Sequence, residues 1–368
     1  MTQEPALTSH FSLITQNFDA FSPRPVARAN LLLGGILEES KRPDIIFLQE
    51  VTSDVRTSIL GNPKVREAFL VTDAEDRTSF EGVPFANMTL LSSKRFAFDL
   101  ELQKEENGVE RWEKFMLGSV SRVKLPSKYG RCALSVDLIS PSTPSTPSTT
   151  CRLINVHPDS LGDALPYRTE QMQILANLLR EPGCGGGLIA GDFNAISPED
   201  HALLDKNGLV DAWVALHGKK EPDGATWGVG MKRHDGLGPG RLDKAAMSSV
   251  VAKDTEILRP GLSEVPKPGE DSDYISCSDH YGLRLGFTVG VLSSTSGLAL
   301  DDHSRTGSEP FIISTACSDY YSAYASIKFI CVVGLCYSHM LVISSASATN
   351  RKGGTKALTP VLSRMMSE

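Results

Sequence analysis

The chain has 368 residues, enough for one large α/β domain or two ordinary ones, with 40% hydrophobic and 22% charged residues. Its formal net charge of -7 excludes the broad basic surface of a bulk nucleic-acid binder. Local action on a nucleic acid stays open, because a bound divalent cation offsets active-site carboxylates.

The cysteines and the first residues bear on the compartment. There are seven cysteines, an odd number, and no Cys-x-x-Cys pair. This pattern favours reduced thiols over a disulfide framework or a zinc site. Residues 1–10 lack a basic start followed by an apolar run, so we expect no signal peptide. We therefore expect an intracellular protein, in the nucleus, the cytoplasm or both; the nuclear alternative rests only on the expected substrate.

The first half of the chain contains strands and one clear helix. An alternating run that stops at polar residues predicts a strand at 11–17. Residues 25–40 have a helical pattern that ends before Pro43. The short apolar run at 44–49, flanked by breakers, predicts a buried central strand. Further strands are expected at 87–92, 115–123, 131–139 and 151–157.

Residues 140–150 are rich in Ser, Thr and Pro and cannot pack into a core. A domain boundary is one interpretation of this segment. The flanking segments have the patterns of neighbouring strands, so we favour a solvated loop insertion within one domain.

The second half continues the alternation of helices and strands. Pro166 opens a helix with one apolar face, residues 187–190 predict a buried strand, and Ser197 with Pro198 starts another helix. Residues 281–289 alternate as a final strand. Together these elements predict an α/β (α+β) fold with two mixed sheets and outer helices, in one catalytic domain over 8–290.

The character changes beyond residue 290. We expect 291–368 to be a disordered tail, or a tail that is not a natural product of the gene. Residues 329–346 are apolar and contain no Asp, Glu, Lys or Arg. A single membrane anchor therefore stays open as the alternative, although the run is short and contains His339.

Five polar clusters lie at the ends of predicted strands. They contain Asn17, Glu50, His157, Asp192 with Asn194, and Asp279 with His280. A buried strand that ends in a carboxylate needs a compensating partner, because an unpaired buried charge is costly. The set offers hard oxygen ligands and no thiolate, which favours Mg²⁺ or Mn²⁺ over zinc.

The ordered series of motifs resembles the endonuclease/exonuclease/phosphatase family. The segments NVHPDS, AGDFN, LVDAW, ATWG, RLDK and SDHYGLRL are most similar to its 5′-tyrosyl-DNA phosphodiesterase branch. The likeness runs through nearly all of residues 11–289, and GDFN and SDH each after a strand are its strongest part. The resemblance implies a DNase I-like four-layer α/β sandwich with two central mixed sheets.

The resemblance also implies roles by position. Glu50 would be the principal Mg²⁺ ligand, with Asn17 beside it. Asp192 would orient or deprotonate the attacking water, and Asn194 would hold this water and a phosphate oxygen. The chemistry would be in-line attack on phosphorus, helped by positioning and charge neutralisation.

The histidines complete the implied set. His280 would stabilise the transition-state charge or protonate the leaving group, with Asp279 fixing its orientation. His157 would bind a non-bridging phosphate oxygen.

Three further residues are candidates for substrate binding. Ser160 follows the NVHPD segment, and Arg168 on the next helix faces either the cleft or the solvent. Trp227 in a Gly-rich loop stacks a base or an aromatic leaving group, or packs in the core. Two departures from the branch, Gln16 for a common Trp and Asp159 for a common Glu, leave the catalytic set intact.

These features predict a Mg²⁺-dependent phosphodiesterase, with Mn²⁺ as a possible substitute. Its expected substrate is a 5′-phosphotyrosyl-DNA bond or another DNA end, in DNA repair. The partners would then be DNA ends or a protein–DNA adduct, bound by a monomer. A phosphoesterase for lipids or small phosphodiesters on the same fold is the first alternative, and a non-catalytic binding module is the second.

Overall fold

The computed structural model describes residues 9–39, 42–98, 103–104, 110–111, 114–139, 148–218, 224–230, 237–265 and 272–289. The chain divides into two compact units, Met1–Val333 and Gly334–Glu368, and all described residues belong to the first. The expected tail at 291–368, its apolar stretch at 329–346 and most of the loop insertion at 140–150 lie outside the described residues. Within the described part, every helix is too short or too polar to cross a bilayer.

The first sheet has six strands in the order β14-β17-β1-β2-β4-β3. In chain order, its strands are β1 (Ser9–Asn17), β2 (Ile45–Val51), β3 (Phe69–Val71), β4 (Ala86–Ser92), β14 (Val250–Leu258) and β17 (Gly282–Val289). β1 runs parallel to β2, and the other pairings are antiparallel. The sheet is therefore mixed.

The second sheet has seven strands in the order β12-β13-β11-β10-β9-β8-β5. In chain order, its strands are β5 (Phe96–Ala97), β8 (Phe115–Lys124), β9 (Cys132–Ile139), β10 (Thr150–Val156), β11 (Cys184–Asp192), β12 (Val210–Asp211) and β13 (Asp243–Ser248). β10 is parallel to β11, and β5 is parallel to β8. This sheet is also mixed.

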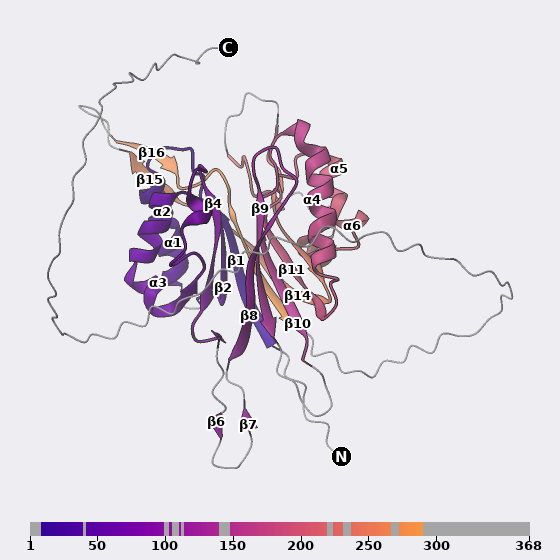
Figure 1. Ribbon diagram of the computed structural model, residues 1–368. Coiled ribbons are helices and arrows are strands. Elements are labelled where there is room, and N and C mark those ends of the chain that lie inside the picture. Colours follow the sequence, from indigo (N-terminus) through magenta and orange to yellow (C-terminus); the bar gives the residue numbers. More distant parts are fainter. Residues whose placement is uncertain are drawn as a thin grey trace, which may run out of the picture. The chain divides into compact units, whose positions relative to one another are not determined.

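The two sheets pack face to face over a shared apolar core (Figure 1). From the first sheet this core takes Phe11, Leu13 and Phe47, and from the second it takes residues such as Leu134 and Leu188. All five side chains are buried. Burial of these facing surfaces is the main force that holds the sheets together.

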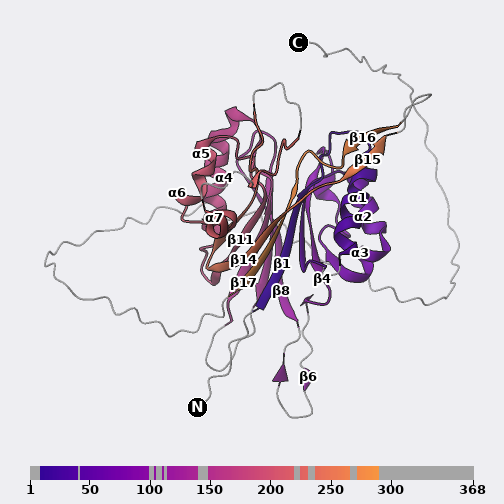
Figure 2. The same cartoon turned by 180° about the vertical axis from the view of Figure 1, so that it is seen from behind.

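Helices cover the outer face of each sheet, as both views show (Figures 1 and 2). The first sheet is covered by α1 (Pro25–Glu38), α2 (Ser53–Gly61) and α3 (Pro63–Ala68). The second is covered mainly by α4 (Leu165–Leu178) and α6 (Leu203–Lys206). The layers are therefore helix, sheet, sheet and helix.

Short elements complete the described chain. They are α5 (Pro198–His201), α7 (Ala212–His217), the single 3₁₀ turns Thr78–Phe80 and Gly162–Ala164, and two ribbons, β6 (Gln103–Lys104) with β7 (Glu110–Arg111) and β15 (Leu262–Val265) with β16 (Asp273–Ser276).

The structure confirms the predicted fold class, two mixed sheets between layers of helices. The predicted strands all occur, and the helices expected at 25–40 and from Pro166 are α1 and α4. The helix expected after Ser197 is only the short α5, whose first turn Ser197 closes in a capping box with Asp200. The sequence pattern did not indicate α2 or β14.

The topology brings the ends of four strands to one edge of the sandwich. Asn17 at the end of β1 pairs with Gln49 near the end of β2, and Val156 at the end of β10 pairs with Gly191 in β11. A buried amide connects the sheets here, because Gln49 Nε2 donates to Asn155 Oδ1 at 2.8 Å. Polar residues that follow these strands therefore meet.

Candidate active site

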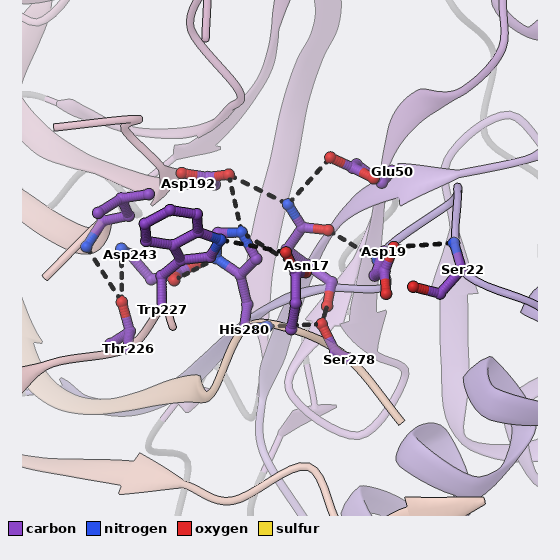
Figure 3. Close-up of polar contacts among 12 residues, drawn as sticks. Asn17, Asp19, Ser22, Glu50, Asp192, Thr226, Trp227, Asp243, Ser278 and His280 are labelled. Atoms are coloured by element: carbon purple, nitrogen blue, oxygen red, sulfur yellow. Dashed lines mark hydrogen bonds and ion pairs between the residues drawn. The ribbon is translucent and has the colours of Figure 1, made fainter. Parts of the chain in front are cut away.

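Side chains from both sheets converge on the Asn17 amide (Figure 3). Its Nδ2 lies 3.3 Å from Glu50 Oε1 and 3.1 Å from Asp192 Oδ2. Its Oδ1 accepts a hydrogen bond from the Asp19 backbone N–H at 2.8 Å. Asn17 and Glu50 belong to the first sheet and Asp192 to the second, so three predicted site residues meet across the sandwich.

Glu50 owes its position to an irregularity in β2. The pairing of β2 with β4 shifts register between Leu48 and Val51, and Glu50 has a backbone φ of 55°. Such a φ is uncommon outside glycine, and bulges of this kind re-aim a side chain at a sheet edge. Burial raises the pKa of Glu50, and although the Ala20 backbone N–H opposes this shift, the Asp192 charge adds to it.

Gly191 allows β10 and β11 to approach closely below the site. Its φ is 148°, and a Cβ atom at this position would lie 2.0 Å from the Val156 carbonyl oxygen. The next residues on the two strands are His157 and Asp192. Their side chains meet with Nε2 and Oδ2 3.4 Å apart. The glycine of the AGDFN segment therefore allows the close strand approach that brings His157 and Asp192 together.

We expect Gly191→Ala to lower the free energy of unfolding by about 2–4 kcal/mol, because the methyl group must displace the β10 backbone. Urea denaturation measures this loss. Gly183→Ala is the matched control, since Gly183 also has a positive φ, 86°, but has open space around its Cβ position. The control should lose only about 1 kcal/mol. Equal losses in both variants would contradict the close-approach explanation.

His157 is buried beside the carboxylates and is neutral. Its Nε2 lies 3.8 Å from Glu50 Oε1, and its Nδ1 lies 3.2 Å from Nη1 of Arg131. Because a guanidinium only donates, Nδ1 must accept, and the imidazole proton is on Nε2. Burial first, and then the charges of Arg131 and His280, lower the pKa of His157 well below its usual value. Nε2–H therefore points at the cluster as a neutral donor.

His280 lies between two buried carboxylates (Figure 3). Its Nδ1 is 2.8 Å from Asp243 Oδ2, and its Nε2 is 3.6 Å from Asp192 Oδ2. Burial alone would lower the pKa of His280, but the charges of Asp243 and Asp192 outweigh it and raise that pKa well above its usual value. His280 therefore carries two protons at neutral pH.

The geometry favours Asp243 over the expected Asp279 as the residue that orients His280. Asp279 Oδ1 lies 3.9 Å from His280 Nε2, whereas Asp243 binds the opposite ring nitrogen at 2.8 Å. Asp279 Oδ2 instead accepts a hydrogen bond from Trp227 Nε1 at 3.1 Å. Consecutive residues of a loop point in different directions, so adjacency in the sequence did not bring Asp279 onto Nδ1.

Trp227 and Asn194 both lie at the site. The Trp227 ring is half-buried, and its centroid is 6.5 Å from that of His280. Asn194 has a φ of 49°, and its Nδ2 donates to the Pro158 carbonyl at 3.0 Å. Its backbone N–H donates to Asp192 Oδ1 at 2.9 Å. Ser160 is half-buried, two residues beyond Pro158.

Arg168 is not placed as a substrate contact. Its side chain is buried and forms a two-pronged ion pair with Asp200, with nitrogen–oxygen distances of 2.7 and 3.0 Å. Its Nη1 donates to the carbonyls of Asp159 and Leu161. The guanidinium thus holds the loop after β10 against α5. The helical periodicity could not show which face α5 would cover.

Two charged residues of the site were absent from the set predicted by sequence. Asp243 starts β13 opposite Asp192 and partners His280. Arg131 contacts His157, and its guanidinium carbon lies 4.9 Å from the centre of the Phe85 ring. The sequence could have indicated Asp243 as a site residue, because it lies in the RLDK segment as an acidic residue at the start of an apolar run. We find no comparable signal for Arg131.

The oxygen donors of Glu50 and Asp192 fit a hard divalent cation. Both carboxylates are largely enclosed and approach the same Asn17 nitrogen, an arrangement of like charges that a cation would neutralise. Asn17 would join as a ligand only if its amide turned Oδ1 toward them.

A second group, Asp192, Asp243 and His280, also places donor atoms within 4.8 Å of one another. In this group His280 Nδ1 already contacts Asp243 Oδ2 at 2.8 Å, so only Nε2 of the ring would be available to an ion.

The model of a family described as "Endonuclease/Exonuclease/phosphatase family" matches residues 15–280. The curated proteins gave no significant match.

Several solved structures share the fold. D. rerio TDP2 humanised by 14 mutations is 17% identical, with a TM-score of 0.52, over 76% of this chain and 98% of that chain. TDP2 from C. elegans is 18% identical, with a TM-score of 0.51, over 76% of this chain and 75% of that chain. D. rerio TDP2 complexed with single strand DNA product is 16% identical, with a TM-score of 0.53, over 76% of this chain and 99% of that chain. At such identities the likeness concerns the fold.

Proposed function

The chain belongs to the endonuclease/exonuclease/phosphatase family, and from this premise we propose that it is a metal-dependent phosphodiesterase acting on a DNA end. The observation that carries the proposal is the meeting of Glu50, Asp192, His157 and His280 at one edge of the sandwich. Such a set can bind a phosphodiester, accept a proton from water and donate a proton to an oxygen of the phosphate.

Asp192 and His280 are the base and the acid of the proposed reaction. Burial raises the pKa of Asp192, which brings this carboxylate closer to the basicity that accepting a proton from water requires. His280 keeps its proton because Asp243 holds Nδ1, and Nε2–H is then available to the leaving oxygen. Water attacks phosphorus, the bond to the leaving oxygen breaks, and the leaving oxygen takes the proton from His280.

His157, Arg131 and Asn194 would hold the phosphate. The Nε2–H of His157 donates without adding charge, and Arg131 behind it supplies the positive charge. Asn194 is fixed by the Pro158 carbonyl and by Asp192, so its side chain needs little reorganisation. Donors fixed in advance in a buried site contribute most when charge develops on the phosphate oxygens.

A divalent cation would be held by Glu50, with Asn17 after rotation of its amide, and Asp192 would remain free to accept the proton from water. Such a cation, Mg²⁺ or Mn²⁺ by the hardness of these ligands, would offset the carboxylate charges and polarise the phosphate.

A 5′-phosphotyrosyl-DNA bond, or a related DNA end, is the substrate that we propose. The support is the similarity of the motifs and fold to TDP2, one structure of which contains single strand DNA product. The half-buried Trp227 beside His280 could pack against an aromatic leaving group. The four cysteines of the described segments are free thiols, in keeping with the intracellular location proposed.

The test is hydrolysis of a single-stranded 5′-phosphotyrosyl oligonucleotide with Mg²⁺ and with EDTA. We expect tyrosine release to fall at least about 10³-fold with EDTA and to return when Mg²⁺ is restored. An abasic duplex and a phospholipid head-group substrate are assayed in parallel. If the protein hydrolyses only the abasic duplex or only the phospholipid head-group substrate, that compound is the better substrate assignment. If it hydrolyses none of the three, a non-catalytic binding module is favoured.

A further inference from the structure

A line of aromatic rings leads from the site to the solvent. The Phe85 ring stacks on His157, with centroids 5.5 Å apart and planes 20° apart. Phe21 meets Phe85 edge to face, with centroids 5.6 Å apart and planes 82° apart. His157 and Arg131 already lie against Phe85, but Phe21 is 76% exposed. The exposed ring of the line is therefore Phe21.

The loop that carries Phe21 is firmly held. Arg28 is completely buried, and its Nη2 donates to the carbonyls of Asp19 and Ser22, on either side of Phe21. Asp19 Oδ1 accepts a hydrogen bond from the Ser22 backbone N–H at 3.1 Å. The backbone is thus fixed while a large apolar ring faces water. A fixed, exposed phenylalanine beside a reactive site is typical of a binding surface.

Basic and aromatic side chains continue along residues 128–131, where Lys128 Nζ also pairs with Asp163 Oδ2 at 2.6 Å. The Arg131 guanidinium carbon is 5.9 Å from the centre of the Tyr129 ring, and Lys128 Nζ is 5.4 Å from that centre. Tyr129 is 40% exposed. Aromatic rings interleaved with Arg and Lys are the chemistry by which proteins hold single-stranded nucleic acid.

We propose that Phe21 stacks an unpaired nucleobase of the substrate, with Phe85 as its support. This inference rests on the proposed function, because it places the base of the nucleotide that carries the scissile phosphate. His157 would hold that phosphate, and Phe85 joins His157 to Phe21 through direct ring contacts. In a nucleotide the base and the phosphate are joined by the sugar. The exposed Phe21 ring, which we call the platform, and the phosphate-binding His157 could therefore contact the base and the phosphate of one nucleotide.

Binding of a product-like oligonucleotide tests the platform without requiring turnover. The probe is a single-stranded 5′-phosphorylated oligonucleotide with 2-aminopurine as its first base, compared with one that is abasic at that position. We expect the wild-type protein to bind the base-bearing probe about tenfold more tightly and to quench its fluorescence. Phe21→Ala should reduce this ratio to near one, and Phe21→Trp should preserve it.

Val251→Ala is the matched control. Val251 is also exposed, at 55%. It pairs with Thr288, and Thr288 in turn pairs with His10. His10 lies near the start of β1, whereas the site residue Asn17 lies at the end of that strand. The ratio should be unchanged in this variant. A ratio that survives in Phe21→Ala, or a wild-type protein that binds neither probe, would overturn the proposal.

The test separates the platform from the proposed function. A base-dependent ratio that needs Phe21, combined with no hydrolysis of any phosphodiester, would contradict the enzyme and leave the platform. Hydrolysis of a phosphodiester, combined with equal affinity for the base-bearing and abasic probes, would support the enzyme and contradict the platform. If Phe21→Ala instead changes only the preference for a tyrosyl over an alkyl leaving group, the ring binds the leaving group and the nucleobase assignment is wrong.

Discussion

Asp243→Asn is expected to lower kcat by about 10²–10⁴-fold and to leave KM within a few-fold of wild type. Asp243 is buried and accepts from His280 Nδ1 at 2.8 Å, so it holds the imidazolium in place while Nε2 faces the substrate. An asparagine keeps the size but removes the charge that favours the protonated ring. Steady-state kinetics on the substrate proposed above measures this effect.

The pH dependence follows from the same ion pair. The proposed active form has His280 protonated, and Asp243 is the largest cause that raises its pKa. In Asp243→Asn the high-pH limit of activity should therefore move to lower pH. The raised pKa also stabilises the fold below the usual histidine pKa, and this contribution is lost as pH rises through the folded-state value. The free energy of unfolding, measured across pH, should therefore decrease less with rising pH in Asp243→Asn than in the wild type.

Asp279→Asn is the control for this assignment. Asp279 is adjacent to His280 in the chain but lies 3.9 Å from Nε2 and bonds to Trp227. We expect it to lower kcat less than Asp243→Asn does. A larger loss in Asp279→Asn would restore the orienting role predicted from the sequence and would refute the one assigned to Asp243.

Glu50→Gln is expected to reduce Mg²⁺-dependent activity at least about 10³-fold and to abolish the stabilisation that Mg²⁺ gives to the wild type. The wild-type protein should gain about 2.7 kcal/mol when the ion is present at one hundred times its Kd. Without the ion, the variant should be more stable than wild type at neutral pH. The reason is that a carboxyl whose pKa is raised on folding disfavours the folded state when ionised.

Thermal unfolding with and without Mg²⁺ measures both effects. The matched control is Glu38→Gln, which removes a carboxylate on α1 that is 71% exposed and pairs with Lys64. This control should keep the Mg²⁺ shift. An intact Mg²⁺ shift in Glu50→Gln would mean that the ion binds elsewhere, and the group of Asp192, Asp243 and His280 would then be the site to examine.

The sequence predicted the fold class and the meeting of the strand ends, because each depends on local patterns. Buried runs followed by polar residues mark the ends of β2 and β11, where Glu50 and Asp192 lie. It could not predict that Asp243 would face His280. That contact depends on the antiparallel register of β11 with β13, which places Asp192 opposite Asp243.

The sequence also failed to predict the contacts of two arginines, because both contacts depend on tertiary structure. Arg168 stood near a catalytic motif but pairs with Asp200 inside the protein. Arg131 lies on the far side of the Ser/Thr/Pro-rich segment from His157, yet their side chains touch. Distance along the chain says little about tertiary contact once strands pair, and a long charged side chain can satisfy its donors in either direction.

The place of β17 in the first sheet has a consequence during protein synthesis. This strand is the last to emerge of the six, yet it inserts between β14 and β1 and does not add at an edge. Until residues 282–289 have left the ribosome, β1 exposes an unpaired edge, and His280, two residues before this segment, lacks the strand that fixes its position. A nascent or prematurely ended chain can therefore carry Glu50 and Asp192 without forming the complete site, so the proposed hydrolysis would require synthesis beyond residue 289.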